Sequence, residues 1–174
     1  MDQNEPISVV ALYRFARIAD PEALRKRLAA RCCAAGLRGT LLVATEGVNG
    51  TVAGTPEATR TLVDWLQGEA RLSGMEVKYS TASSMPFHRM KVRLKREIVT
   101  MGEPHIDPLS AAGAYVEPAE WNALIADPDT VVIDTRNAYE VALGTFANAV
   151  DPGTETFSDF PAWARAHRDE LAGK

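Results

Sequence analysis

The sequence predicts an α+β domain over residues 1–101, a linker over 102–114 and the first part of an α/β domain over 115–174. Hydrophobic periods before residue 100 follow the order strand, helix, strand, strand, helix, strand, which is the ferredoxin-like (acylphosphatase-like) order with two helices on one face of an antiparallel sheet. Glycines and prolines interrupt every period between 102 and 113. Beyond them, a short apolar run bounded by turn residues is typical of a buried parallel strand.

The first strand and the first helix are expected between residues 7 and 36. A period of two predicts a strand whose aromatic-rich face lies on the core, formed by Ile7, Val9, Ala11, Tyr13 and Phe15. Asp20-Pro21-Glu22 then supplies an N-cap, a proline at the first helical position and an acid in the first turn. Leu24, Leu28 and Cys32 follow at helical spacing, and Gly36 is expected to end the helix.

Residues 38–54 are predicted to form a β-hairpin. Leu41–Val43 is too continuously apolar for a strand with one face in water, and Glu46-Gly47 and Asn49-Gly50 provide positive-φ residues for the reversal. Thr55-Pro56-Glu57 repeats the pattern that begins a helix, and a fourth strand is expected around Val77. One core is expected to contain Leu24, Leu28, Leu42, Leu62, Trp65, Val77 and Val92.

A fifth strand is predicted at residues 90–95, with apolar side chains facing one way and three bases the other. Lys91, Arg93 and Lys95 would then stand about 6.6 Å apart, a row suited to phosphates. With Arg89 and Arg96 there are five bases in eight residues, which is more than a solubilising face needs, although that interpretation stays open. Arg38 and His88 are candidates to extend the row, and a lone histidine is more often an ordinary, partly buried side chain.

Charge divides unequally along the chain. Residues 1–100 contain 15 Lys and Arg against 10 Asp and Glu, whereas residues 101–174 contain 4 against 13. Only the first part is therefore expected to meet a polyanion. The adjacent Cys32 and Cys33 argue against a disulfide scaffold, and no apolar run is long enough to span a bilayer. A cytoplasmic protein without a membrane partner is expected.

In the second part, Glu117-Pro118 is expected to begin a short helix, and residues 131–133 to form the buried strand. Asp134 and Arg136 follow at the carboxyl end of that strand, the edge where α/β proteins build their sites. We expect the Asp134 carboxylate to accept backbone donors and Arg136 to pair with an internal carboxylate such as Glu140, so that the three residues support an active-site loop.

Five stretches resemble the tRNA uridine hydroxylase family, whose members contain a rhodanese domain. They are LVATEGVNGTV at 42–52, PFHRMKVRLKREIV at 86–99, YVEPAEWN at 115–122, VIDTRNAYEVALGTFANA at 132–149 and FSDFPAW at 157–163. The fourth stretch is similar to the opening of a rhodanese domain in both residue type and spacing. The resemblance covers nearly the whole chain, from about residue 9 to residue 163.

This resemblance implies oxygen-dependent 5-hydroxylation of the wobble uridine 34 of tRNA, with molecular oxygen as co-substrate, no evident cofactor and no DNA partner. It assigns tRNA binding to the first domain, through Arg38, His88, Arg89, Lys91, Arg93, Lys95 and Arg96. Glu46 and Asn49 become candidates for a nucleotide contact, although hairpins select such residues for backbone reasons.

The rhodanese active site is a loop that begins with a nucleophilic cysteine, and no cysteine follows Cys33. The chain is therefore expected to end within its rhodanese-like domain, to contain no catalytic residue and to be inactive. Cys32 and Cys33 belong to a helix of the first domain and are not expected to replace that thiolate, because Cys32 lies on the apolar stripe.

Alternatives from other classes are a rhodanese-type sulfurtransferase and an RNA-binding adaptor with a non-catalytic rhodanese-like domain. Acylphosphatase activity is disfavoured because no arginine-bearing phosphate loop follows the first strand. A two-histidine, one-carboxylate iron site would need His105, Asp107 and His167. No metal site is predicted, because the first two of these residues lie in the expected linker, without rigid support.

Overall fold

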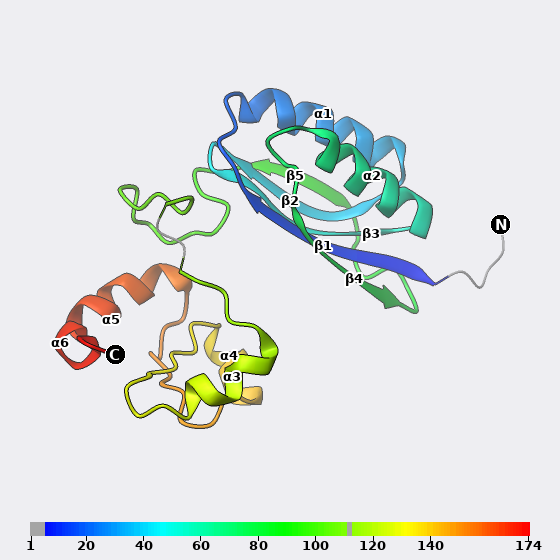
Figure 1. Ribbon diagram of the computed structural model, residues 1–174. Coiled ribbons are helices and arrows are strands. Elements are labelled where there is room, and N and C mark those ends of the chain that lie inside the picture. The colour runs from blue at the N-terminus through cyan, green and yellow to red at the C-terminus, as the bar shows by residue number, and fades with distance from the viewer. Residues whose placement is uncertain (1–5, 111–112) are drawn as a thin grey trace. The chain divides into compact units, whose positions relative to one another are not determined.

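The computed structural model describes residues 6–110 and 113–174, and the chain divides into two compact units at the boundary between Val99 and Thr100. The elements of the first unit are β1 (Ile7–Phe15), α1 (Pro21–Ala34), β2 (Arg38–Ala44), β3 (Gly47–Gly54), α2 (Pro56–Gly68), β4 (Glu76–Ala82) and β5 (Met90–Leu94) (Figure 1).

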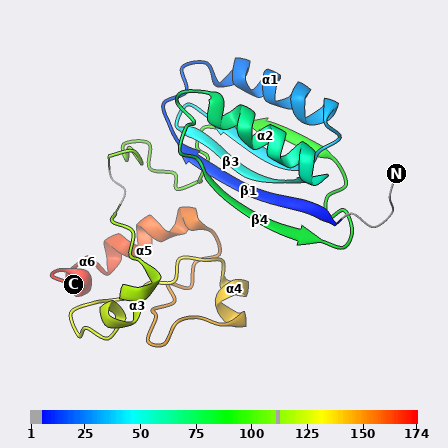
Figure 2. The same ribbon diagram turned by 45° about the vertical axis from the view of Figure 1, so that its right-hand side comes forward.

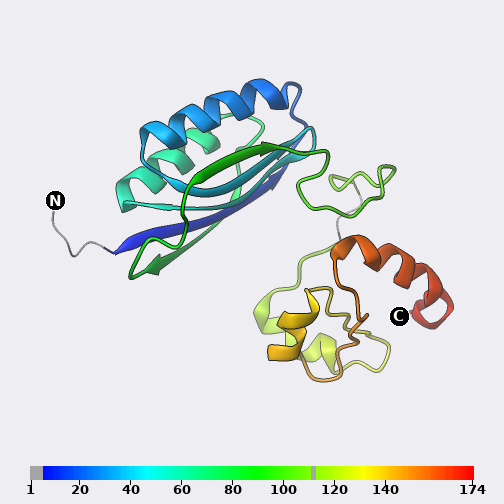
Figure 3. The same ribbon diagram turned by 180° about the vertical axis from the view of Figure 1, so that it is seen from behind.

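The five strands form one sheet in the order β4-β1-β3-β2-β5. Strand β1 pairs antiparallel with β3 and β4, β2 pairs antiparallel with β3, and β5 lies parallel to β2 at the edge. Helices α1 and α2 both cover the same face of this sheet (Figures 1 and 2). The same layering is visible from behind (Figure 3). The predicted ferredoxin-like, acylphosphatase-like order is confirmed.

Both helices of the first unit begin as the sequence predicts. The Asp20 carboxylate accepts a hydrogen bond from the Ala23 N–H at 2.9 Å, and the Thr55 hydroxyl accepts one from the Ala58 N–H at 3.2 Å. A proline occupies the start of each helix. After α1, Gly36 has a φ of +66°, the left-handed conformation expected at a helix end. These local signals need no tertiary support, which explains their accuracy.

The core lies between the helices and one face of the sheet. Leu24, Leu28 and Leu62 are buried there, and Trp65, Val77 and Val92 are partly buried against the same cluster. The prediction for Leu42 was wrong: this side chain is only half-buried, and Leu41 and Val43 on either side of it enter the core instead. Strand β2 is covered by helices on one face only, so consecutive residues separate into core and surface.

The prediction for the face of β1 was also wrong. Ser8, Val10 and Leu12 are buried beneath the helices, whereas Tyr13 and Phe15 lie on the opposite face and are half-buried. Alternation shows that a strand has two different faces. It does not show which face is buried, because aromatic and aliphatic side chains are both suited to the core.

The reversal between β2 and β3 is shorter than the sequence suggests. It consists of Thr45 and Glu46, and Asn49 and Gly50 lie inside β3, so their assignment to the turn was wrong. Gly50 has a φ of +151°, and a Cβ atom there would overlap the carbonyl oxygen of Thr40 on the neighbouring strand. Glycine is therefore required here by close strand packing as well as by conformation.

The second unit contains α3 (Pro118–Ile125), α4 (Ala138–Leu143), a 3-10 turn η1 (Phe157–Asp159), α5 (Phe160–Ala166) and α6 (Arg168–Leu171). The helix beginning at Pro118 was predicted. The expected strand at 131–133 was not found: in the described part of this unit it is reduced to a parallel bridge between Ile133 and Val150, and residues 131–133 are half-buried. A buried parallel strand needs a neighbour paired along its length and covered faces, and a single bridge supplies neither.

Candidate nucleic-acid interface

The sheet face opposite α1 and α2 is the candidate site, and we call it the open face. Strand pairing aligns its side chains in rows across the sheet. The row at the centre consists of Lys78, Ala11, Thr51, Thr40 and Lys91, and its neighbours consist of Ser80, Val9, Ala53 and Arg38 on one side and Glu76, Tyr13, Asn49, Leu42 and Arg93 on the other. These residues come from all five strands, so only the folded sheet brings them together.

Four cations stand on the open face. Arg38, Lys78 and Arg93 are exposed and Lys91 is half-buried. Within the described ranges, none of the four side chains makes an ion pair or a side-chain hydrogen bond. Since no described carboxylate pairs with any of them, the face is suited to an anionic ligand.

The cations of α1 differ, because each has a partner. Arg25 and Lys26 pair with Glu22 at 2.8 and 3.7 Å. Arg27 pairs with Glu69 at 2.7 Å, and the guanidinium carbon of Arg31 lies 4.6 Å from the centre of the Trp65 ring. These contacts hold the basic side chains of α1 against their neighbours.

The predicted tRNA-binding residues fall on or beside β5. Arg38, Lys91 and Arg93 share the open face, and Lys95 continues the ladder through its N–H to the carbonyl of Val43 at 2.9 Å. Arg89 immediately precedes β5, and its carbonyl accepts the Gly39 N–H at 3.1 Å. His88 and Arg96 are exposed near the two ends of β5. Their contact with tRNA stays a prediction.

Sequence reasoning missed Lys78, Thr40 and Thr51 as members of this surface. Lys78 stood on the polar side of the predicted fourth strand, so its alternation was a usable signal. That alternation does not show which strands are neighbours in the sheet. Without the order of the strands, Lys78 could not be assigned to the same face as the basic side chains of β5.

Glu46 and Asn49 hold a main-chain segment in place. The Glu46 carboxylate accepts the Ile98 N–H at 2.6 Å, and the Asn49 amide donates to the Ile98 carbonyl at 3.0 Å. Ile98 is buried, and its side chain lies against Gly47. We call this arrangement the Ile98 clamp. It closes one end of the open face and gives both side chains a structural role beside the nucleotide contact proposed from sequence.

In the second unit, Asp134 organises the segment that was expected to support an active-site loop. Its carboxylate accepts hydrogen bonds from the Arg136 guanidinium at 2.6 and 2.9 Å and from the Thr145 hydroxyl at 2.7 Å. The Arg136 hydrogen bonds, followed by that of Thr145, hold the pKa of Asp134 well below its usual range. Arg136 also donates to the Gly144 carbonyl at 2.7 Å, which fastens the loop after α4.

The expected pairing of Arg136 with Glu140 was wrong. The Glu140 carboxylate instead accepts from the side chain of Asn137 at 2.8 Å and closes a capping box at the start of α4. Asp134 is only two residues from Arg136 and reaches the guanidinium first, and Glu140 is suited to the helix N-terminus.

The two cysteines are inequivalent. Cys32 is fully buried, and burial raises the pKa of its thiol to about 12, with a smaller contribution from the adjacent Cys33, which is exposed. Among the described residues, no group of three His, Cys, Asp or Glu side chains is arranged to hold a metal ion. No described helix has the length and apolar character needed to cross a membrane.

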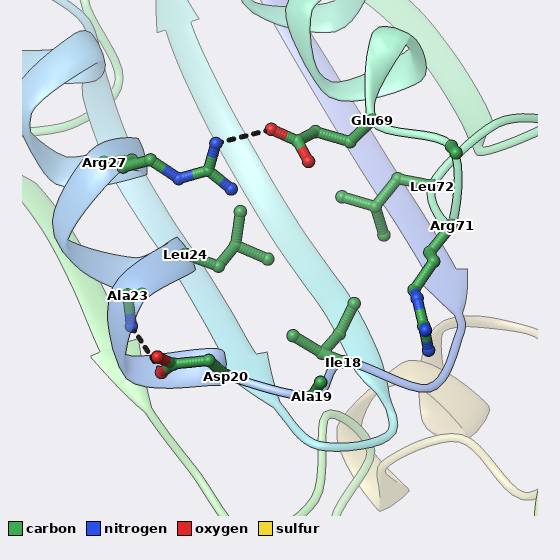
Figure 4. A pocket seen from close by; sticks show the side chains of 10 residues that line it. Ile18, Ala19, Asp20, Ala23, Leu24, Arg27, Glu69, Arg71 and Leu72 are labelled. Carbon is green, nitrogen blue, oxygen red and sulfur yellow. Dashed lines mark hydrogen bonds and ion pairs between the residues drawn. The ribbon is translucent and has the colours of Figure 1, made fainter.

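A cavity of about 330 Å³ lies between the start of α1 and the end of α2 (Figure 4). Asp20 in its wall caps α1, Arg27 and Glu69 pair with each other, and Arg71 donates to the Arg17 carbonyl at 2.8 Å. Because these polar groups are engaged in the fold itself, the open face is the stronger candidate site.

Comparisons with known proteins cover the first unit by a family pattern and nearly the whole chain by curated relatives. The sequence pattern described as the UPF0176 acylphosphatase like domain matches residues 7–98. Proteins named tRNA uridine(34) hydroxylase from Mesorhizobium japonicum and Brucella anthropi are 61% and 58% identical over 98% of this chain. The chain spans 55% and 56% of the length of these two relatives. Among solved structures, the acylphosphatase from Bacillus subtilis shares 14% identity at a TM-score of 0.41, over 50% of this chain and 98% of that one.

Proposed function

The chain belongs to the family of the UPF0176 acylphosphatase-like domain, and on that premise we propose that the whole protein hydroxylates uridine 34 of tRNA, with molecular oxygen as co-substrate. The observation that carries the proposal is the 61% identity, over 98% of the chain, to a relative named tRNA uridine(34) hydroxylase. Identity of this extent reaches both units of the chain.

Within this activity, the first unit binds tRNA through the open face. Arg38, Lys91 and Arg93 form a group of unpaired cations on adjoining strands, and Lys95 extends it. Each cation that meets a phosphate releases condensed counterions, so the affinity falls as salt concentration rises. The net positive charge of residues 1–100 also attracts the polyanionic tRNA at long range.

The binding test is a matched pair of charge reversals. Lys91→Glu with Arg93→Glu removes two cations from the open face, and Lys26→Glu with Arg60→Glu changes the net charge equally on the helix layer. The first variant should bind tRNA at least about tenfold more weakly, with a salt dependence flattened by up to about two charges. The second should bind nearly as the unchanged chain does. Equal losses in the two variants would leave only net charge as the cause.

The activity test uses the whole gene. Mass spectrometry of tRNA nucleosides should show hydroxylated uridine at position 34 in the parent strain and none in a strain that lacks the gene. Restoring the gene with the Lys91→Glu and Arg93→Glu changes should restore less of the modification than the unchanged gene does. A deletion strain with full modification would reject the proposed reaction, whatever the chain binds.

A further inference from the structure

We propose that the open face binds an unpaired stretch of RNA, with the phosphates along β5 and the bases over the hydroxyl-bearing centre of the sheet. This inference rests on the proposed binding of tRNA and specifies which structural form of RNA the face accepts. The observations that carry it are the row of side chains at the centre, the unequal charge of the two edges and the closed end at the Ile98 clamp.

The central row is low and carries no acid. Between Lys78 and Lys91 it consists of Ala11, Thr51 and Thr40, of which Ala11 is exposed and both threonines are half-buried. Short side chains let a ligand approach the sheet closely. A threonine hydroxyl both donates and accepts, so the pair can satisfy the edge of any base or a ribose 2′-hydroxyl.

The two edges of the open face differ in charge. On the side of β2 and β5 stand Arg38, Lys91 and Arg93, whereas on β4 Lys78 is two residues from Glu76. These edges are about 19 Å apart, four strand spacings. A single phosphate backbone can lie along the basic edge while its bases lie over the uncharged side chains at the centre of the sheet.

A double helix fits this surface less well. It presents two phosphate backbones and keeps its bases stacked inside, so recognition uses shape, phosphates and 2′-hydroxyls. Its convex surface would meet the sheet over a narrow strip and would leave most of the threonine floor uncontacted. An unpaired strand exposes both phosphates and bases, and can satisfy the basic edge and the hydroxyls at the same time.

The Ile98 clamp limits the face at one end. Glu46 and Asn49 hold Ile98 over the Gly47 end of β3, where a nucleotide would otherwise reach the sheet. Space for the bases is therefore centred on the central row, because Ala53 in the row that contains Arg38 is fully buried. The clamp acts as a wall of the site, and its two polar side chains are occupied by Ile98.

The experiment compares two labelled probes on the full 174-residue chain by fluorescence anisotropy. One is a single-stranded oligouridylate of about 12 nucleotides, within the range of known single-strand sites. The other is an RNA duplex with the same number of phosphates per strand. We expect the single strand to bind at least about tenfold more tightly than the duplex at equal salt.

The decisive variant is Thr40→Val with Thr51→Val, which keeps the side-chain shape and removes both hydroxyls. Loss of two hydrogen bonds should weaken the single strand about tenfold and leave the duplex unchanged. Thr81→Val is the matched control, because Thr81 is exposed on β4 but pairs with Ser8 on the helix-covered side. This variant should bind both probes as tightly as the unchanged chain does.

Equal affinity for the two probes, or a valine variant that binds the single strand normally, would overturn this inference. The charge reversal at Lys91 and Arg93 separates it from the proposed function. If that reversal weakens tRNA binding while the valine variant is silent, the tRNA surface stands and the preference for unpaired RNA is rejected. If the reversal leaves tRNA binding intact, both are rejected.

Discussion

Helix α1 and the open face of the sheet both carry several basic side chains, but the surroundings of those side chains differ. On α1, Arg25, Lys26 and Arg27 have carboxylate partners and Arg31 lies over the Trp65 ring. On the open face, Arg38, Lys78, Lys91 and Arg93 have no such partner in the part of the chain that the structure describes. Counting bases along the sequence does not distinguish the two surfaces.

The absence of a carboxylate partner, more than the number of charges, therefore marks a surface suited to an anion. A cation held by a carboxylate has much of its field cancelled, and a phosphate must compete with the existing partner. A cation without a partner meets its ligand at no such cost. The two faces also differ in what lies beneath them, since one covers the core and the other is a floor for a ligand.

The largest expected effect compares neighbouring leucines on opposite faces of β2. Leu41→Ala removes a fully buried side chain and should lower the free energy of unfolding by about 2–5 kcal/mol. Leu42→Ala, on the open face, should cost less than about half as much, because Leu42 already contacts solvent. Urea unfolding of the two variants measures both values, and similar losses would contradict the assignment of the core to one face.

A second comparison uses glycines. Gly50→Ala should destabilise by about 2–3 kcal/mol, because a positive φ and the Thr40 carbonyl both oppose a side chain there. At Gly68 in α2 a Cβ meets nothing within 4 Å, so Gly68→Ala should be neutral or stabilise by up to about 1 kcal/mol. Thermal unfolding measures the melting temperatures of both variants, and equal temperatures would contradict the prediction.

The Ile98 clamp offers a third comparison, at the end of the open face. Glu46→Ala leaves the buried Ile98 N–H without its acceptor and should cost about 1–2 kcal/mol. Glu46→Gln keeps an acceptor oxygen and should retain most of that stability. Chemical denaturation measures the free energy of unfolding of both variants. An alanine variant as stable as the glutamine variant would show that the clamp does not stabilise the fold.

The smallest effect belongs to the helix side and depends on pH. Burial raises the pKa of the Cys32 thiol to about 12, so the folded chain keeps a proton that the unfolded chain releases above its ordinary pKa of about 8.5–9. The contribution of this proton to stability is therefore fully present below pH 8.5–9 and is lost as pH rises toward 12, with a loss of about 1 kcal/mol near pH 9.5. The difference between unfolding curves of the parent and of Cys32→Ala should show this slope, and a constant difference would contradict it.

Local signals in the sequence predicted the helices well, together with the succession of helices and strands along the chain. The caps at Asp20 and Thr55 act within one turn of the chain, and the basic alternation of β5 depends only on its own residues. Tertiary choices were less accessible. The side of β1 that meets the helices, and the place of Asn49-Gly50 inside β3, depend on strands that are distant in sequence.

The candidate site was predicted in part for the same reason. Lys91 and Arg93 could be recognised within one strand, whereas Thr40, Thr51 and Lys78 join them only through the strand order. Arg136 was expected to form an ion pair with Glu140, and it forms one with Asp134 instead. Two carboxylates near one guanidinium were equally eligible by sequence, and local backbone geometry selected between them.

The position of β5 at the end of the strand order has a further consequence, for self-association. Only one side of β5 pairs with β2, so the other side is a sheet edge to which a second polypeptide could add a strand. Lysine and arginine along that edge oppose such pairing, because two copies would bring like charges together. Variants that replace Lys91 and Arg93 with valine should aggregate during purification, whereas glutamate variants should remain monodisperse by light scattering. The residues proposed to attract RNA would then also keep copies of the chain apart.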